Sequence, residues 1–281
     1  MKFFCINSLF AAEFFGIILC TSASSTHRRV LFDCLSVDST AEAGYTGSSK
    51  KKGAVFSMAK RTKLSDRTLP DYCKGEEIMN MVTHIVGGSL GVAALVLCLL
   101  KALIRGDGYD LAGAILYGVS MITLYTMSSV YHGLKPGMGK KVLQVLDHCT
   151  IYFLIAGTYS IIALSALRVV SPTLGWGIFV FQWGMSVLAV TLTAIDLEKY
   201  NVFSMICYIG MGWCIAPFLP QARQALTAPG FWLLLWGGIA YTIGAVLYGI
   251  GSKIRWMHSV FHIFVVLGSL LQFLCIIFYV L

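Results

Sequence analysis

SSVYHGLKPGMGKKVLQVLDH, residues 128–148, decides the fold of this chain, because it ends one apolar run, makes a short basic turn and begins the next. Ser128 and His132 lie before the turn, and Asp147 and His148 lie after it. Ionisable side chains at membrane depth are costly and usually mark function. The stretch therefore predicts two antiparallel helices that bring polar side chains to one end of an apolar bundle.

The composition indicates an integral membrane protein. Of the 281 residues 57% are hydrophobic and 12% are charged, and the mean hydropathy is +0.78. A soluble domain usually has about 25% charged residues, so this chain has too few to cover a water-facing surface. We interpret the net charge of +8 as orientation charge beside a membrane and expect no nucleic-acid partner. The expected partner is membrane lipid.

The N-terminal part differs from the rest of the chain. Residues 1–25 resemble a weak secretory signal, in which Glu13 interrupts the apolar run. Residues 26–57 have neither a helical nor a strand period. We therefore expect residues 1–57 to be a disordered leader or a spurious extension.

Met58 opens a short basic segment, MAKRTKLSD. Three alternatives for the preceding residues stay open: translation starts at Met58, a signal peptide is cleaved, or the apolar run forms an additional eighth span. Residues 58–80 are predicted to be a basic cytoplasmic segment, and residues 81–281 a membrane domain.

Apolar runs of about 20 residues repeat through this domain, and that length allows a helix to cross a bilayer. They lie near residues 82–103, 110–132, 146–167, 174–195, 201–220, 230–250 and 258–280. Basic residues are dense before the first run and in loops 133–142 and 251–257, and the dense side should be cytoplasmic. The fold class predicted is all-α, a bundle of seven transmembrane helices in the cell membrane, with the N-terminus cytoplasmic and the C-terminus outside.

Five histidines fall at the predicted cytoplasmic end of these spans: His84, His132, His148, His258 and His262. Asp147 lies at the same end and is the only acidic residue inside the seven spans apart from Asp110, which is the first residue of the second span. Ser128 and His132 are four residues apart, as are His258 and His262, so each pair shares one face of its helix. Two histidines at this spacing can bind one metal ion from a single helix.

The pattern predicts a metal centre. Three imidazoles with an open fourth position are typical of a catalytic zinc, and His132 is the natural third ligand beside His258 and His262. Asp147 and Ser128 would then hydrogen-bond a metal-bound water or orient a ligand. The alternative is that the histidines are packed polar residues at helix ends, and the pattern leaves it open.

Polar side chains before and within the first span share roughly one helix face: Glu77, Asn80, Thr83 and His84. We expect Glu77, Asn80, His84 and His148 to support the metal ligands through hydrogen bonds. Cys149 is a further candidate ligand, but a cysteine within an apolar run is usually a packed small hydrophobe.

These motifs together resemble the hemolysin III family of bacterial membrane proteins, which is related to the progestin and adipoQ receptors and, more distantly, to alkaline ceramidases. The matching pieces are E-x-x-N-x-x-T-H from Glu77 to His84, S-x-x-x-H from Ser128 to His132, LDHCTIYFLIAGTYS from Leu146 to Ser160, and H-x-x-x-H from His258 to His262. With the spans they cover about residues 75–281. Cys149 departs from the family, which more often has serine there.

The resemblance implies a zinc ion bound by His132, His258 and His262 near the cytoplasmic face, with Asp147 hydrogen-bonded to the zinc-bound water and Ser128 alongside. The first functional hypothesis is a zinc-dependent hydrolase of a lipid amide or ester. The second is a non-enzymatic receptor or regulator of membrane lipid state with structural zinc. The third, a cytolytic pore former, follows only from the family name, and spans that are apolar all round argue against it. The sequence leaves the oligomeric state open.

Overall fold

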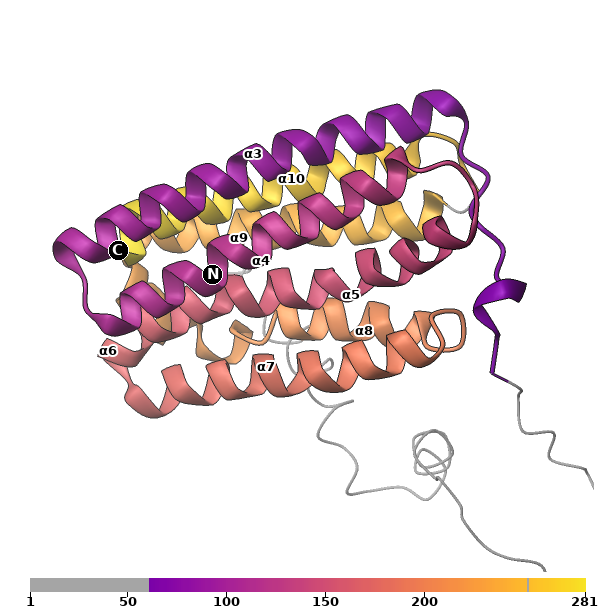
Figure 1. Cartoon of the computed structure of the whole chain (residues 1–281). Coiled ribbons are helices and arrows are strands. Elements are labelled where there is room, and N and C mark those ends of the chain that lie inside the picture. Colours follow the sequence, from indigo (N-terminus) through magenta and orange to yellow (C-terminus); the bar gives the residue numbers. More distant parts are fainter. Residues whose placement is uncertain (1–60, 252) are drawn as a thin grey trace, which may run out of the picture. The chain divides into compact units, whose positions relative to one another are not determined.

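The computed structural model describes residues 61–251 and 253–281, which belong to one compact unit. The interpretations of residues 1–57 and of Met58 lie outside this part of the chain. Every regular element among the described residues is helical (Figure 1). The prediction of an all-α fold is confirmed.

The helices follow the apolar runs. In chain order they are α3 (Lys74–Arg105), α4 (Gly108–Gly133), α5 (Met138–Ile161), α6 (Arg168–Val170), α7 (Pro172–Ile195), α8 (Asn201–Gly212), α9 (Leu219–Gly251) and α10 (Met257–Cys275). The shorter elements are the 3-10 turns η1 (Leu64–Asp66) and η3 (Ala216–Phe218) and the π-helical stretches η2 (Ile162–Leu167) and η4 (Ile276–Val280).

Local signals set several helix ends. The Asp107 carboxylate accepts hydrogen bonds from the backbone N–H groups of Tyr109 and Asp110 and so caps the start of α4. Ser171 caps α7, and Pro172 occupies its first position, where the missing N–H is not needed. These caps separate consecutive apolar helices by short turns.

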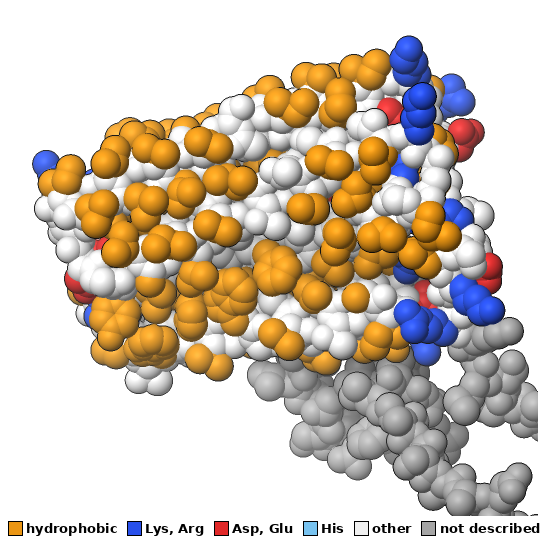
Figure 2. Space-filling view, in the orientation of Figure 1, with side chains coloured by type: hydrophobic (Ala, Val, Ile, Leu, Met, Phe, Trp, Pro, Cys, Tyr) orange, Lys and Arg blue, Asp and Glu red, His pale blue; other side chains and the backbone are white. Residues whose placement is uncertain are grey.

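Six helical stretches within the described residues are long and apolar enough to cross a membrane: Lys74–Arg105, Gly108–Gly133, Met138–Val170, Pro172–Ile195, Asn201–Gly251 and Met257–Val280. Each has at least 24 residues, more than the about 20 that a crossing needs. Hydrophobic side chains cover the sides of the bundle, and Lys and Arg gather at its ends (Figure 2).

The fifth and sixth predicted spans lie within one of these stretches, Asn201–Gly251. Its first helix, α8, has only 12 residues, and α9 is broken at Thr227, where φ is 61°. Pro217 falls between the two helices, Pro220 is the second residue of α9, and Pro229 follows the break. A proline lacks the N–H that a continuous helix requires. A count of seven separate helices is therefore not confirmed.

The third stretch is the centre of the bundle. In its most apolar window 72% of Met138–Val170 is buried, against 28% for the corresponding windows of Lys74–Arg105 and Pro172–Ile195. α5 packs against α4 on one side and α7 on the other, while α3 lies along α4 and α10 (Figure 1). The helices that carry the candidate ligands, α4 and α10, therefore both pack against α3.

Small residues bring α3 close to α4. A Cβ atom at Gly87 would overlap the ring of Tyr125, and one at Gly91 would lie 3.2 Å from the Met121 side chain. Tyr125 cannot swing away freely, because it is fully buried and its hydroxyl donates a 2.6 Å hydrogen bond to Ser269 on α10. The absence of a side chain at Gly87 therefore allows α3, α4 and α10 to pack closely around Tyr125.

We predict that Gly87→Ala lowers the free energy of unfolding by about 1–3 kcal/mol, the usual effect of forcing extra atoms into a packed interior. The matched control is Gly184→Ala on α7, where an added Cβ meets nothing within 4 Å. The control should be neutral or stabilising by up to about 1 kcal/mol. Reversible unfolding in mixed micelles measures both, and equal stabilities for the two variants would contradict the packing described.

Candidate metal centre

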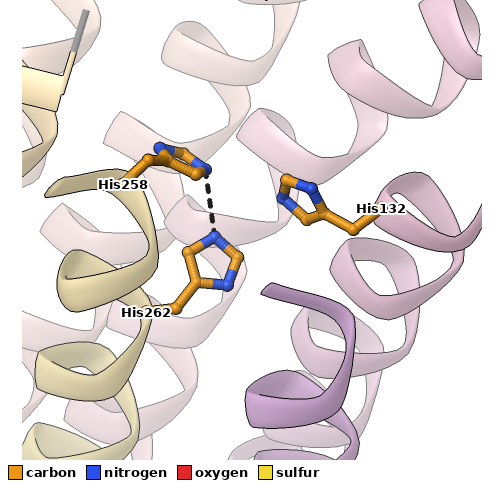
Figure 3. A group of neighbouring side chains, drawn as sticks. All are labelled: His132, His258 and His262. Carbon is orange, nitrogen blue, oxygen red and sulfur yellow. Dashed lines mark hydrogen bonds between the residues drawn. The ribbon is translucent and has the colours of Figure 1, made fainter. Parts of the chain in front are cut away.

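Three buried histidines converge from two helices. His132 lies near the end of α4, and His258 and His262 lie in the first half of α10. Their exposed fractions are 3%, 8% and 1%, and one ring nitrogen from each lies within 4.8 Å of the others. Figure 3 shows the three rings around a common space between the helices.

The ring nitrogens face one another in a way that fits a metal ion. The Nε2 atoms of His258 and His262 are 3.1 Å apart, and Nε2 of His132 is buried without a hydrogen-bond partner among the described residues. Buried nitrogens in proteins are normally satisfied, so such an atom beside two converging nitrogens calls for a further group. His132, His258 and His262 could together hold a metal ion such as zinc, which would give these nitrogens a partner.

Glu77 on α3 orients the His132 ring. Its Oε2 atom is 2.7 Å from Nδ1 of His132, and its Oε1 atom accepts a 2.6 Å hydrogen bond from Nζ of Lys140. Lys140 is only 4% exposed and also donates to the backbone carbonyl of Leu134. A carboxylate on the far nitrogen of an imidazole fixes the tautomer that presents the other nitrogen to a metal.

Asn80 joins the same helix to both ligand-bearing helices. Its side-chain oxygen accepts a 2.6 Å hydrogen bond from Ser259 on α10, and its nitrogen is 3.4 Å from Nδ1 of His132 on α4. Asn80 is fully buried. The polar face predicted from the spacing of Glu77 and Asn80 therefore points at the histidine cluster.

Two other candidates lie outside the three-histidine group. His84 stacks on His262 with ring centroids 3.8 Å apart and meets the Tyr125 ring edge-on. Both of its nitrogens are buried and lack a partner in the described part of the chain. Cys149 is buried with its sulfur 3.9 Å from the carbonyl of Val190, so it is packed as expected.

His148 and Asp147 lie beside the cluster. Nδ1 of His148 is 2.8 Å from the backbone oxygen of Gln144, and Nε2 is 3.1 Å from the hydroxyl of Tyr248. The Asp147 carboxylate is 4.0 Å from Nδ1 of His148. Asp147 is partly exposed and lines the cavity described next.

A mostly apolar cavity of about 170 Å³ extends from the histidines into the bundle. Ser128, Asp147, His258 and His262 are among the residues that line its polar end. Leucine, isoleucine and aromatic side chains of α5, α8, α9 and α10 line the remainder. Such a cavity fits a hydrocarbon chain whose polar group meets the histidines.

Sequence reasoning missed Tyr72, Ser259 and the role of Lys140. The Tyr72 ring stacks on His258 at 4.8 Å, and burial raises the pKa of its hydroxyl well above its usual range, so the group stays protonated. Tyr72 precedes every periodic segment, so no pattern marks it. Ser259 could have been found from its position next to His258, whereas Lys140 resembles the other basic residues of its loop.

A strained residue begins α10. Trp256 has φ 67°, a left-handed conformation that bulky residues rarely adopt. Its backbone N–H donates a 2.6 Å hydrogen bond to Oε1 of Glu76 on α3. Strain of this kind costs about 1–3 kcal/mol and persists where the surroundings hold it. The hydrogen bond to Glu76 fixes the turn that precedes His258.

Residues 73–273 match the model of the family described as Haemolysin-III related. The chain belongs to this family. It is 36% identical over 206 residues to Hemolysin-3 of Bacillus cereus, covering 73% of this chain and 92% of that protein. It is 34% identical over 204 residues to the Hemolysin-3 homolog of Bacillus subtilis (strain 168), covering 73% and 94%.

A more distant relative is the human Monocyte to macrophage differentiation factor, 26% identical over 209 residues, which are 72% of this chain and 83% of that protein. The resemblance identified from the motifs is confirmed by the family match. Together with the six apolar helical stretches, it identifies a multi-pass protein of the cell membrane.

The pairing of Glu77 with Lys140 gives a test of the network. Breaking a buried ion pair leaves one charge uncompensated, so Glu77→Gln and Lys140→Met should each lower the free energy of unfolding by roughly 3 kcal/mol. The double variant should lose clearly less than the sum of the two, with a coupling of about 1–3 kcal/mol. Unfolding in mixed micelles measures this cycle.

The control for charge alone is Lys135→Met, because Lys135 is exposed in the same loop. It should change the free energy of unfolding by less than about 0.5 kcal/mol. Strict additivity of the Glu77 and Lys140 changes would show that the pair does not act as a unit.

Proposed function

We propose that this protein is a zinc-dependent hydrolase of a membrane lipid amide or ester, with zinc bound by His132, His258 and His262. One observation carries the proposal: two members of a buried three-histidine group, His258 and His262, line a mostly apolar cavity that Asp147 and Ser128 also line. A purely structural site has no need of a cavity or of an acidic group beside it.

When bound, zinc would supply a Lewis acid that polarises a carbonyl and lowers the pKa of a bound water to roughly 7. Asp147 accepts the proton of the attacking water as general base. The Ser128 hydroxyl donates a hydrogen bond to the oxygen on which negative charge develops. Glu77 holds the His132 ring in place, and the apolar cavity binds the acyl chain.

The proposal includes seven membrane crossings, with the histidine end at the cytoplasm. Asn201 and Tyr248 line one common pocket, which supports two crossings by Asn201–Gly251, outward and back. Lys and Arg are denser at the end where α3 begins (Figure 2), and such density favours the cytoplasmic side.

A second candidate is a non-enzymatic receptor or regulator of membrane lipid state, in which zinc is structural. It is favoured by the origin of the ligands, because His132 lies on α4 and both other histidines lie on α10. An ion shared by them would join the two helices, with Asn80 of α3 attached through its hydrogen bond to Ser259.

Metal content tests the centre. Purified protein should hold about one zinc per chain by elemental analysis, and His132→Ala/His258→Ala/His262→Ala should hold none, because three imidazoles bind the ion together. His148→Gln is the matched control, since His148 lies at the same end but outside the group. Full zinc content in the triple variant would show that the ligand assignment is wrong.

Turnover separates the two candidate functions. Release of fatty acid from long-chain N-acyl amides and esters in mixed micelles should fall at least about 100-fold in Asp147→Asn, because a general base typically contributes 10²–10⁴-fold. Zinc content should stay unchanged. Asp71→Asn, which removes an exposed carboxylate just before α3, should retain full activity. Zinc-loaded wild type without release on either substrate class would favour the structural role.

A further inference from the structure

A buried arginine, Arg67, lies next to the histidine end of the bundle. Arg67 is 5% exposed, and its Nε and Nη1 atoms have no hydrogen-bond partner within the described residues. A charge removed from water needs a partner, because otherwise its lost hydration is not compensated. Two of the three guanidinium nitrogens of Arg67 therefore have no hydrogen-bonding anionic partner among these residues, and an added anionic group would supply one.

The segment that carries Arg67 is fixed to the bundle. The backbone N–H of Thr62 donates a 2.8 Å hydrogen bond to Asp196, at the end of α7. Lys141 of α5 donates a 2.6 Å hydrogen bond to the carbonyl of Ser65, within η1. The position of Arg67 directly after η1 is therefore set by contacts on both sides of the bundle end.

The nearby carboxylates do not pair with this arginine. Each oxygen of Asp196 accepts a hydrogen bond from a backbone N–H group, that of Thr62 or that of Lys199, and the described residues show no ion pair between Asp196 and Arg67. Burial would raise the pKa of Asp196, but these bonds and the charge of Arg67 hold it below its ordinary value. Glu198 is exposed and forms no ion pair with Arg67 in the described part of the chain.

Arg67 lines a polar pocket of about 280 Å³. Thr68, Gln144 and Asn201 contribute further hydrogen-bond donors to its wall, and Glu198 contributes a carboxylate. Donors on several sides suit the three terminal oxygens of a phosphate, and the planar fork of an arginine binds such oxygens in pairs.

This polar pocket adjoins the apolar cavity. His148, Asn201 and Tyr248 line both spaces. A molecule with a charged head in the polar pocket can therefore extend its hydrocarbon chain past the histidine cluster into the bundle. The two spaces together match the polarity of a lipid with an anionic head.

We propose that the polar pocket binds a phosphate group through Arg67, and that this phosphate is the headgroup of a lipid whose acyl chain occupies the apolar cavity. Inorganic phosphate carries the same anionic group and is the alternative ligand for this pocket. Binding requires neither zinc nor turnover, so this site and the proposed hydrolysis can fail independently.

The test compares dodecyl [³²P]phosphate with [³²P]phosphate on the full-length protein immobilised in a nonionic detergent. The wild type should bind dodecyl phosphate more tightly than inorganic phosphate. Arg67→Gln should lower the affinity for dodecyl phosphate at least about tenfold, because hydrogen bonds to a charged group are lost. Arg67→Lys keeps the positive charge but loses the planar, two-pronged guanidinium group. Its affinity for dodecyl phosphate should therefore lie between those of the wild type and of Arg67→Gln.

The matched control is Lys135→Gln, which removes one exposed positive charge at the same end and should bind like the wild type. Unlabelled dodecanol should compete poorly, because it lacks the phosphate. Equal binding by wild type and Arg67→Gln would overturn the proposal, as would equally effective competition by dodecanol. Equal affinity for both labelled phosphates would overturn the assignment to a lipid.

Two further measurements exclude phosphate binding at a metal ion and allow for an Arg67→Gln variant that does not fold. The wild type should still bind dodecyl phosphate when a chelator is present. If the chelator abolished this binding while the Arg67→Gln substitution left it unchanged, the phosphate would lie at a bound metal and the proposal would be wrong. If Arg67→Gln does not fold, Gln144→Leu removes a neutral donor from the same wall and should weaken binding severalfold. Unchanged binding in that variant would also count against the site.

Discussion

The carboxylate of Glu77, placed between His132 and Lys140, is the interaction on which the histidine end of this protein depends. Three helices and one connecting turn converge there, at the end of an apolar bundle, and His132 and Lys140 are buried from water. One carboxylate provides a partner for an imidazole and for a buried ammonium group. Charge neutrality at that point allows polar residues from different helices to approach one another.

Glu76, the residue before Glu77, positions the other ligand-bearing helix, α10. Glu76 accepts the backbone N–H of Trp256 and so holds the strained turn before α10, and Glu77 orients His132 on α4. Two consecutive residues in the first turn of α3 therefore position both ligand-bearing helices. Their charge also suits the positive end of the α3 dipole. The geometry of the cluster depends on a helix that supplies none of its three ligands.

Much of this could be predicted from the sequence, because helix length and the four-residue spacing of His258 and His262 are local properties. The division of Asn201–Gly251 could not, since three prolines and the left-handed Thr227 break helices in ways that hydropathy does not register. Lys140 looks like any basic loop residue. Its burial depends on Glu77, which lies 63 positions earlier, and no local pattern carries such a pairing.

The order of polarity along the bundle explains why these features occur together. The end at Arg67 is charged, the histidine cluster is polar and buried, and the cavity beyond it is mostly apolar. A lipid has the same order from headgroup through ester or amide linkage to acyl chain. In the proposed complex, alignment of the two would place a linkage, rather than a headgroup or a chain, beside His258 and Asp147. The same gradient excludes bulk water from the cluster, which strengthens every electrostatic interaction within it.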